Sequence, residues 1–175
     1  MKFNSIKEYF YKLNNLCYVI TLVPLGIFIL LYLKMQKGEI HVVVQKGEQV
    51  LIVQVAAFVL SAIALTIVHL VAKKKIKTYS KGLGLGDKMD KYYYLSLGRI
   101  MTGALASVVV AIGLLLTGSE IFSVFFLGIL LWMTYQWPTP KRMCAELLLK
   151  GDEREMVLYK RESLLRRPPL GHPWA

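Results

Sequence analysis

Four long stretches of the chain consist almost entirely of apolar residues. They cover residues 16–33, 50–72, 95–119 and 121–139, and Arg99 is the only Asp, Glu, Lys or Arg within them. An apolar run of about 18 or more residues can cross a bilayer as a helix. The runs lack the alternation of barrel strands and are about twice as long as such strands. The pattern therefore predicts an all-α integral membrane protein with four transmembrane helices.

Polar residues around these stretches divide the chain into three regions. We expect a cytoplasmic amphipathic leader over residues 1–15, a four-helix transmembrane domain over 16–139, and a basic cytoplasmic helical tail over 140–175. Thr139 and Pro140 are typical of an N-cap and a first helical residue. Gly151 predicts a break, and a second, charged helix is expected from Asp152 to about residue 167.

The four helices can be grouped as two hairpins that resemble a tandem repeat. Gly86-Asp87 follows the second span and Gly151-Asp152 follows the fourth, and each aspartate is expected to cap a helix. A repeat of two spans would relate the halves by an axis along the membrane normal. The alternative is that any two membrane hairpins share basic ends and apolar centres.

Composition narrows the class of protein. Hydrophobic residues make up 55% of the 175 residues, charged residues 19%, and the mean hydropathy is +0.48. This apolar content excludes intrinsic disorder. Two cysteines, Cys17 and Cys144, are too few for a disulfide scaffold and lack CxxC spacing.

The basic residues predict the orientation in the membrane. Lys and Arg number 22 against 11 Asp and Glu. Eighteen of the 22 fall in the leader, in the loop after the second span, or in the tail, which lie on one side if four helices cross. Basic residues collect on the cytoplasmic side of membrane proteins. We expect a multi-pass protein of a plasma membrane or bacterial inner membrane with both termini in the cytoplasm, where its charge favours anionic lipids.

One group of polar residues forms a candidate binding layer. Each span has a polar residue about one turn from its cytoplasmic end, namely Asn14 and Asn15, His69, Arg99 and Gln136. Such a layer could hold an anionic lipid headgroup or another anionic ligand. The alternative is that Arg99 snorkels to the interface and the amides lie among the headgroups.

Small residues mark candidate faces for helix packing. They recur at helical spacing in the second and third spans, at Ala57, Ser61 and Ala64 and at Gly103, Ser107 and Ala111. Small side chains let membrane helices approach closely. The spacing leaves open whether these faces pack within the bundle or against another subunit.

The residues offer little support for catalysis. His41, His69 and His172 lack a second ligand at metal-binding spacing, and no catalytic set is visible, so we expect neither a metal nor a cofactor. No specific nucleic-acid partner is indicated. We expect an accessory, assembly or scaffold subunit of a membrane complex, with protein partners or a homo-oligomer. The alternatives are a small oligomeric transporter or channel and, more distantly, a lipid-modifying enzyme. The spans contain no Asp or Glu, which disfavours proton-driven transport.

Overall fold

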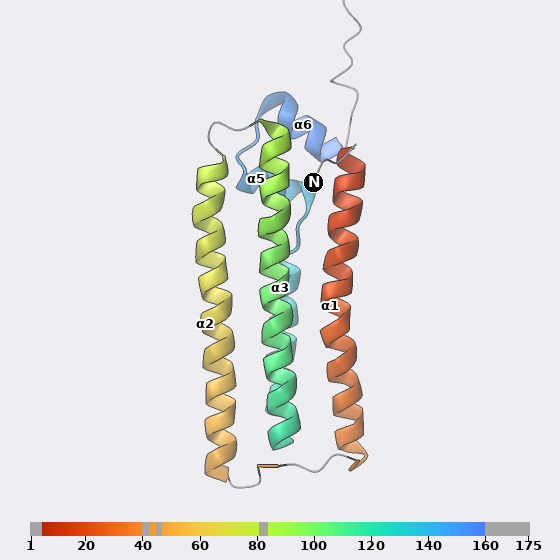
Figure 1. The fold of residues 1–175 in the computed structure, drawn as a ribbon, viewed down its shortest axis with the longest axis vertical. Helices are drawn as coiled ribbons and strands as arrows, with labels where there is room; N and C mark the ends of the chain where they lie inside the picture. The colour runs from red at the N-terminus through yellow and green to blue at the C-terminus, as the bar shows by residue number, and fades with distance from the viewer. Residues whose placement is uncertain (1–4, 40–42, 45–46, 81–83, 160–175) are drawn as a thin grey trace, which may run out of the picture.

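The computed structural model describes residues 5–39, 43–44, 47–80 and 84–159 and contains six helices and no strand within them. The helices run in the order α1 (Ile6–Gln36), α2 (Gly47–Tyr79), α3 (Leu85–Thr117), α4 (Ile121–Tyr135), α5 (Pro140–Glu146) and α6 (Gly151–Tyr159). The first three are long rods that lie side by side, and α5 and α6 cover one end of them (Figure 1). The prediction of an all-helical fold is confirmed.

Three helices are long and apolar enough to cross a membrane. These are α1, α2 and α3, and a fourth span is obtained only if α4 and α5 are joined across a bend of 74°. The chain therefore has the features of a helical membrane protein. Exposed apolar side chains occur along α1, α2, α3 and α4 and suit contact with lipid rather than water.

The fourth apolar stretch is not helical to its predicted end. α4 stops at Tyr135, because Pro138 has no N–H to donate to the helix and its ring would clash with the preceding turn. A new helix begins only after Thr139, whose side chain accepts a hydrogen bond from the N–H of Arg142 at 3.2 Å. Pro140 occupies the first turn, as the sequence predicts.

Two other helix boundaries differ from those expected. α3 starts at Leu85 with Gly84 as its N-cap, and α6 starts at Gly151. Asp87 and Asp152 are therefore not N-caps but lie in the first turn, where a carboxylate favours the positive end of the helix dipole. The end of the second predicted tail helix, near residue 167, falls outside the described residues.

α3 is the centre of the bundle. It packs against α1, α2 and α4, and α1 and α2 lie on its two sides (Figure 1). In the apolar part of α3, 56% of the residues are buried, compared with 17% in α1 and 11% in α2. The first two helices thus follow each other in sequence but lie on opposite sides of α3, and each packs mainly on α3.

The small residues of α3 allow a close approach of α4. A Cβ atom built on Gly103 would lie 2.6 Å from Cγ of Met133, and one on Gly113 would lie 2.3 Å from Cε1 of Phe122. Ser107 and Ala111, between these glycines, are buried as well. The face predicted from Gly103, Ser107 and Ala111 therefore lies inside the bundle.

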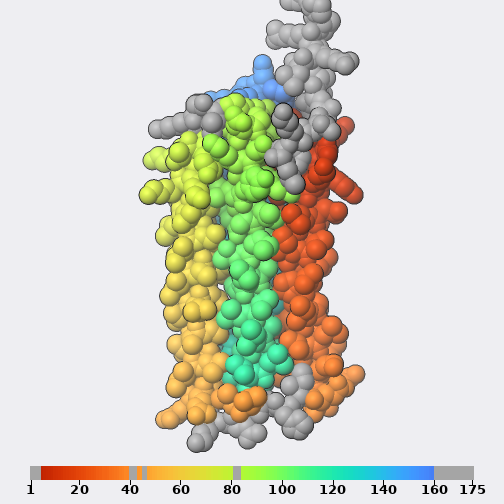
Figure 2. Space-filling view, in the orientation of Figure 1, coloured from red at the N-terminus to blue at the C-terminus, as the bar shows by residue number. Residues whose placement is uncertain are grey.

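Aromatic side chains connect α4 to the two outer helices. Phe126 stacks on Phe28 of α1 with ring centroids 4.0 Å apart, and Phe125 lies 5.2 Å from Phe58 of α2. On α2, Ala57 and Ser61 are buried and Ala64 is half-buried. On the face shown in Figure 2, the side chains of α3 occupy the space between α1 and α2.

Candidate functional site

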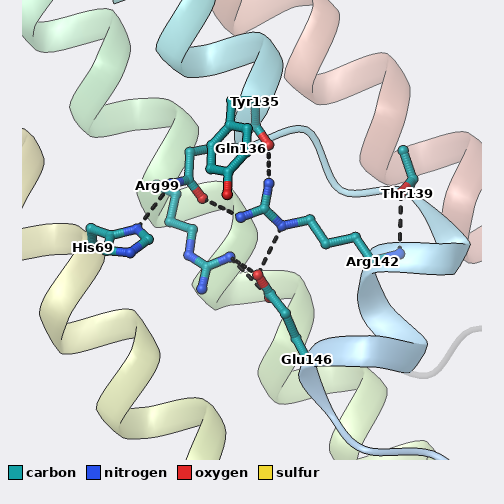
Figure 3. A network of polar contacts seen from close by, with 7 residues as sticks. All are labelled: His69, Arg99, Tyr135, Gln136, Thr139, Arg142 and Glu146. Carbon is teal, nitrogen blue, oxygen red and sulfur yellow. Dashed lines mark hydrogen bonds and ion pairs between the residues drawn. The ribbon is translucent and has the colours of Figure 1, made fainter.

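A network of polar side chains lies where α5 meets the end of the bundle. It joins five residues from separate parts of the chain: His69 of α2, Arg99 of α3, Gln136 after α4, and Arg142 and Glu146 of α5 (Figure 3). α5, which carries Arg142 and Glu146, lies toward the end of the molecule where α2 ends and α3 begins (Figure 1). The network is the candidate functional site.

The turn between α4 and α5 positions the site. Gln136 is the C-cap of α4 and is buried, which fixes its amide at the bundle end. The bend at Pro138 and the cap at Thr139 then direct α5 across that end. Arg142 and Glu146 are four residues apart and so lie on one face of α5. That face points to α3.

Glu146 is shared by two arginines. Nη1 of Arg99 donates to both carboxylate oxygens at 3.0 Å, and Nε of Arg142 donates to Oε1 at 2.8 Å. Hydrogen bonds between ionised partners are about twice as strong as neutral ones. The carboxylate thus ties the central helix to α5.

Arg142 extends the network toward α4 and α2. Its Nη2 donates to Oε1 of Gln136 at 2.7 Å, and its Nη1 donates to the carbonyl oxygen of Tyr135. Nε2 of Gln136 in turn donates to Nδ1 of His69 at 2.9 Å. Because the amide nitrogen can only donate, Nδ1 of His69 is the acceptor of this hydrogen bond. Four helical segments are thereby connected.

The site is largely removed from solvent. The side chain of Arg99 is 3% exposed, and those of Arg142 and Glu146 are 18% and 19% exposed. Two guanidinium groups face one carboxylate, so the three side chains carry a net charge of +1. Nε of Arg99 is buried without a hydrogen-bond partner among the described residues. Such a network depends on its single anion, because an unpaired buried charge is costly.

The structure brings together three of the five residues predicted for the polar layer. His69 and Gln136 are hydrogen-bonded, and Arg99 joins the same network through Glu146. Asn14 and Asn15 of α1 lie elsewhere, in the wall of an open cavity of about 750 Å³. The side chain of Arg99 is buried and paired with Glu146, whereas the snorkelling alternative expects it at the interface.

Sequence reasoning missed Arg142 and Glu146. Residues 140–175 are predicted as a separate cytoplasmic tail, so no contact of their side chains with Arg99 is expected from the sequence. The signal that could have found them is the Arg-x-x-x-Glu spacing directly after Thr139-Pro140. Among the described residues, no group of three or more His, Cys, Asp or Glu side chains is placed to hold a metal ion.

Cys144, next to the site on α5, is expected to be a slow nucleophile. Burial raises the pKa of its thiol, and the nearby charge of Arg154 opposes this shift. A raised pKa leaves less thiolate at a given pH, so alkylation by a water-soluble maleimide should reach its half-maximal rate at a higher pH than for free cysteine. Cys144→Ser is the control, because it leaves Cys17, buried in the bundle, as the remaining thiol. If the pH of half-maximal alkylation were equal to or below that of free cysteine, the burial of Cys144 would be contradicted.

Comparison of the chain with models of protein families, with curated proteins and with solved structures finds no match. The function of the protein is therefore inferred from the arrangement of its own residues.

Proposed function

We propose that the protein is a multi-pass membrane protein that acts as an accessory or assembly subunit of a membrane complex. In this proposal α1, α2 and α3 cross the bilayer, and α4 with residues 136–139 forms a fourth span. α4 contains no charged residue and packs along α3 from Phe122 to Met133, which supports a common depth in the membrane. Both termini are in the cytoplasm.

The observation that carries the proposal is the fixation of the tail by the Glu146 network. Glu146 binds Arg99 of α3, and a second ion pair joins Lys88 of α3 to Glu153 of α6 at 3.1 Å. Leu147 directly after α5 and Val157 of α6 are buried as well. The tail helices are thus held as one surface with the bundle end, which suits the docking of a cytoplasmic partner better than a free tail would.

Packing inside the bundle favours this function over transport. The contact between α3 and α4 is filled by Met133 against Gly103 and by Phe122 against Gly113. The polar residues at the cytoplasmic end are bonded to one another rather than arranged along a path. A transporter normally keeps an ionisable group within its spans for its substrate, whereas Arg99 is engaged by Glu146.

Purification in a mild detergent followed by native mass spectrometry tests the proposed function. An accessory subunit should be recovered with an unlike polypeptide in a fixed ratio. Recovery as a homo-oligomer of this chain would instead support the transporter or channel. Arg142→Gln should loosen the attachment of the tail to the bundle and reduce the amount of bound polypeptide. The control is Lys12→Gln on the exposed face of α1, which should leave that amount unchanged.

The topology is tested separately with reporters that are active only outside the cytoplasm. A reporter fused after Ala175 should be inactive, and one inserted within residues 34–49 should be active, because most basic residues lie on the side of the termini. The reverse activities would refute the proposed orientation. Activity at both positions would show an odd number of spans.

A further inference from the structure

A second cavity, separate from the Glu146 network, lies between α5 and α6. Its volume is about 430 Å³, and its eight lining residues come from α5, from the turn after it and from α6. Three of the eight are basic and none is acidic: Lys141, Lys150 and Arg154. The other lining residues include Ala145, Leu148, Leu149 and Leu158, so the cavity combines cations with an apolar wall.

The turn between the two helices gives this cavity an exposed apolar edge. Leu147 and Leu149 are buried, while Leu148 between them is 69% exposed and has a φ of 53°. A leucine in the left-handed region is strained and persists only where its surroundings hold it there. The two buried neighbours provide that restraint. The result is a leucine that projects beside three cationic side chains.

The position of α5 indicates which ligand suits the cavity. The bend of 74° relative to α4 directs α5 across the end of the apolar bundle rather than along it. In the proposed membrane orientation this end lies at the cytoplasmic headgroup layer. Lys141 and Ala145 are exposed and lie on one side of α5, and the exposed Leu148 of the following turn lines the same cavity. This side would face lipid.

We infer that the α5–α6 cavity binds the headgroup of an anionic phospholipid. Lys141, Lys150 and Arg154 bind the phosphate, and Leu148 contacts the upper acyl chain. Basic side chains at a membrane surface attract anionic lipid, and an exposed apolar residue beside them adds burial in the interface. The inference rests on the proposed membrane insertion, which the reporters test on their own. It moves the lipid site from the predicted polar layer, where Glu146 already engages Arg99, to the tail.

The test measures lipid retained by the full chain in native mass spectrometry, with phosphatidylglycerol and phosphatidylcholine supplied in equal amounts. The triple variant Lys141→Gln, Lys150→Gln and Arg154→Gln should retain about a hundredfold less phosphatidylglycerol, since each surface charge contributes about fivefold and the three factors multiply. The control is Lys73→Gln, Lys74→Gln and Lys75→Gln, which removes the same charge from the exposed end of α2. This control variant should lose much less phosphatidylglycerol than the cavity variant.

Two further measurements distinguish a site for a lipid from a site that attracts any phosphate anion. Phosphatidylglycerol should protect Cys144, which lines the cavity, from a water-soluble maleimide, and glycerol 3-phosphate should protect it poorly. Leu148→Ser should reduce protection by the lipid and leave that by glycerol 3-phosphate unchanged. Equal losses in the two triple variants would overturn the local site. Equal protection by the soluble phosphate would overturn its assignment to a lipid.

Discussion

Glu146→Gln should destabilise the protein by about 3 kcal/mol, because it leaves two largely buried guanidinium groups without their anion. Arg99 and Arg142 both donate to this carboxylate. A neutral amide keeps the shape of the side chain but cannot balance their charge. The measurement is the free energy of unfolding when a denaturing detergent is titrated into the protein in a mild one.

The matched control is Glu153→Gln, which removes the carboxylate of the more exposed Lys88–Glu153 pair. Exposed pairs contribute less than about 1 kcal/mol, and the Glu153 side chain is 37% exposed. Arg99→Met added to Glu146→Gln should recover part of the lost stability, because it removes one of the unpaired cations. Equal effects of the two single variants would show that Glu146 does not hold the tail to the bundle.

Gly113→Ala should destabilise the protein by about 2 kcal/mol, because its new methyl group would meet the ring of Phe122. The ring is fully buried, and its Cε1 would lie 2.3 Å from a Cβ atom on Gly113. Gly103→Ala should cost about 1 kcal/mol, since the flexible Met133 side chain can move aside. Gly103→Leu should cost more, because a larger side chain forces α3 and α4 apart.

Gly128→Ala on α4 is the control for these glycines. A Cβ atom there meets nothing within 4 Å, so the change should be neutral or should stabilise the helix slightly. The same detergent titration reports all four variants. If Gly113→Ala and Gly128→Ala had equal stability, the close packing of α3 on α4 would be refuted.

The sequence predicts the long helices of the bundle well because their apolar runs are continuous. It places the ends less well: α2 continues through its lysines to Tyr79, and α3 begins ten residues before the expected span. A helix continues beyond an apolar run where the flanking residues are good helix formers. An apolar run therefore identifies the apolar part of a helix rather than its full length.

The candidate site was harder to predict because it depends on tertiary contacts. His69, Arg99 and Gln136 could be grouped from their depth along the spans, and the structure brings these three together. Asn14 has the same depth, but it faces an open cavity on α1. The position of a residue along a span predicts its depth in the membrane, but it does not predict which neighbouring helix the side chain faces. The link between Arg99 and Glu146 spans 47 residues and follows from the bend at Pro138, whose direction no local pattern gives.

We propose an accessory subunit whose tail is fixed to the bundle end and presented to a partner. The most direct test of this proposal is native mass spectrometry of the protein purified from its own membrane in a mild detergent. The account predicts an unlike polypeptide bound in a fixed ratio and reduced in Arg142→Gln but retained in Lys12→Gln. Recovery of homo-oligomers that contain only this chain, unchanged in either variant, would contradict it.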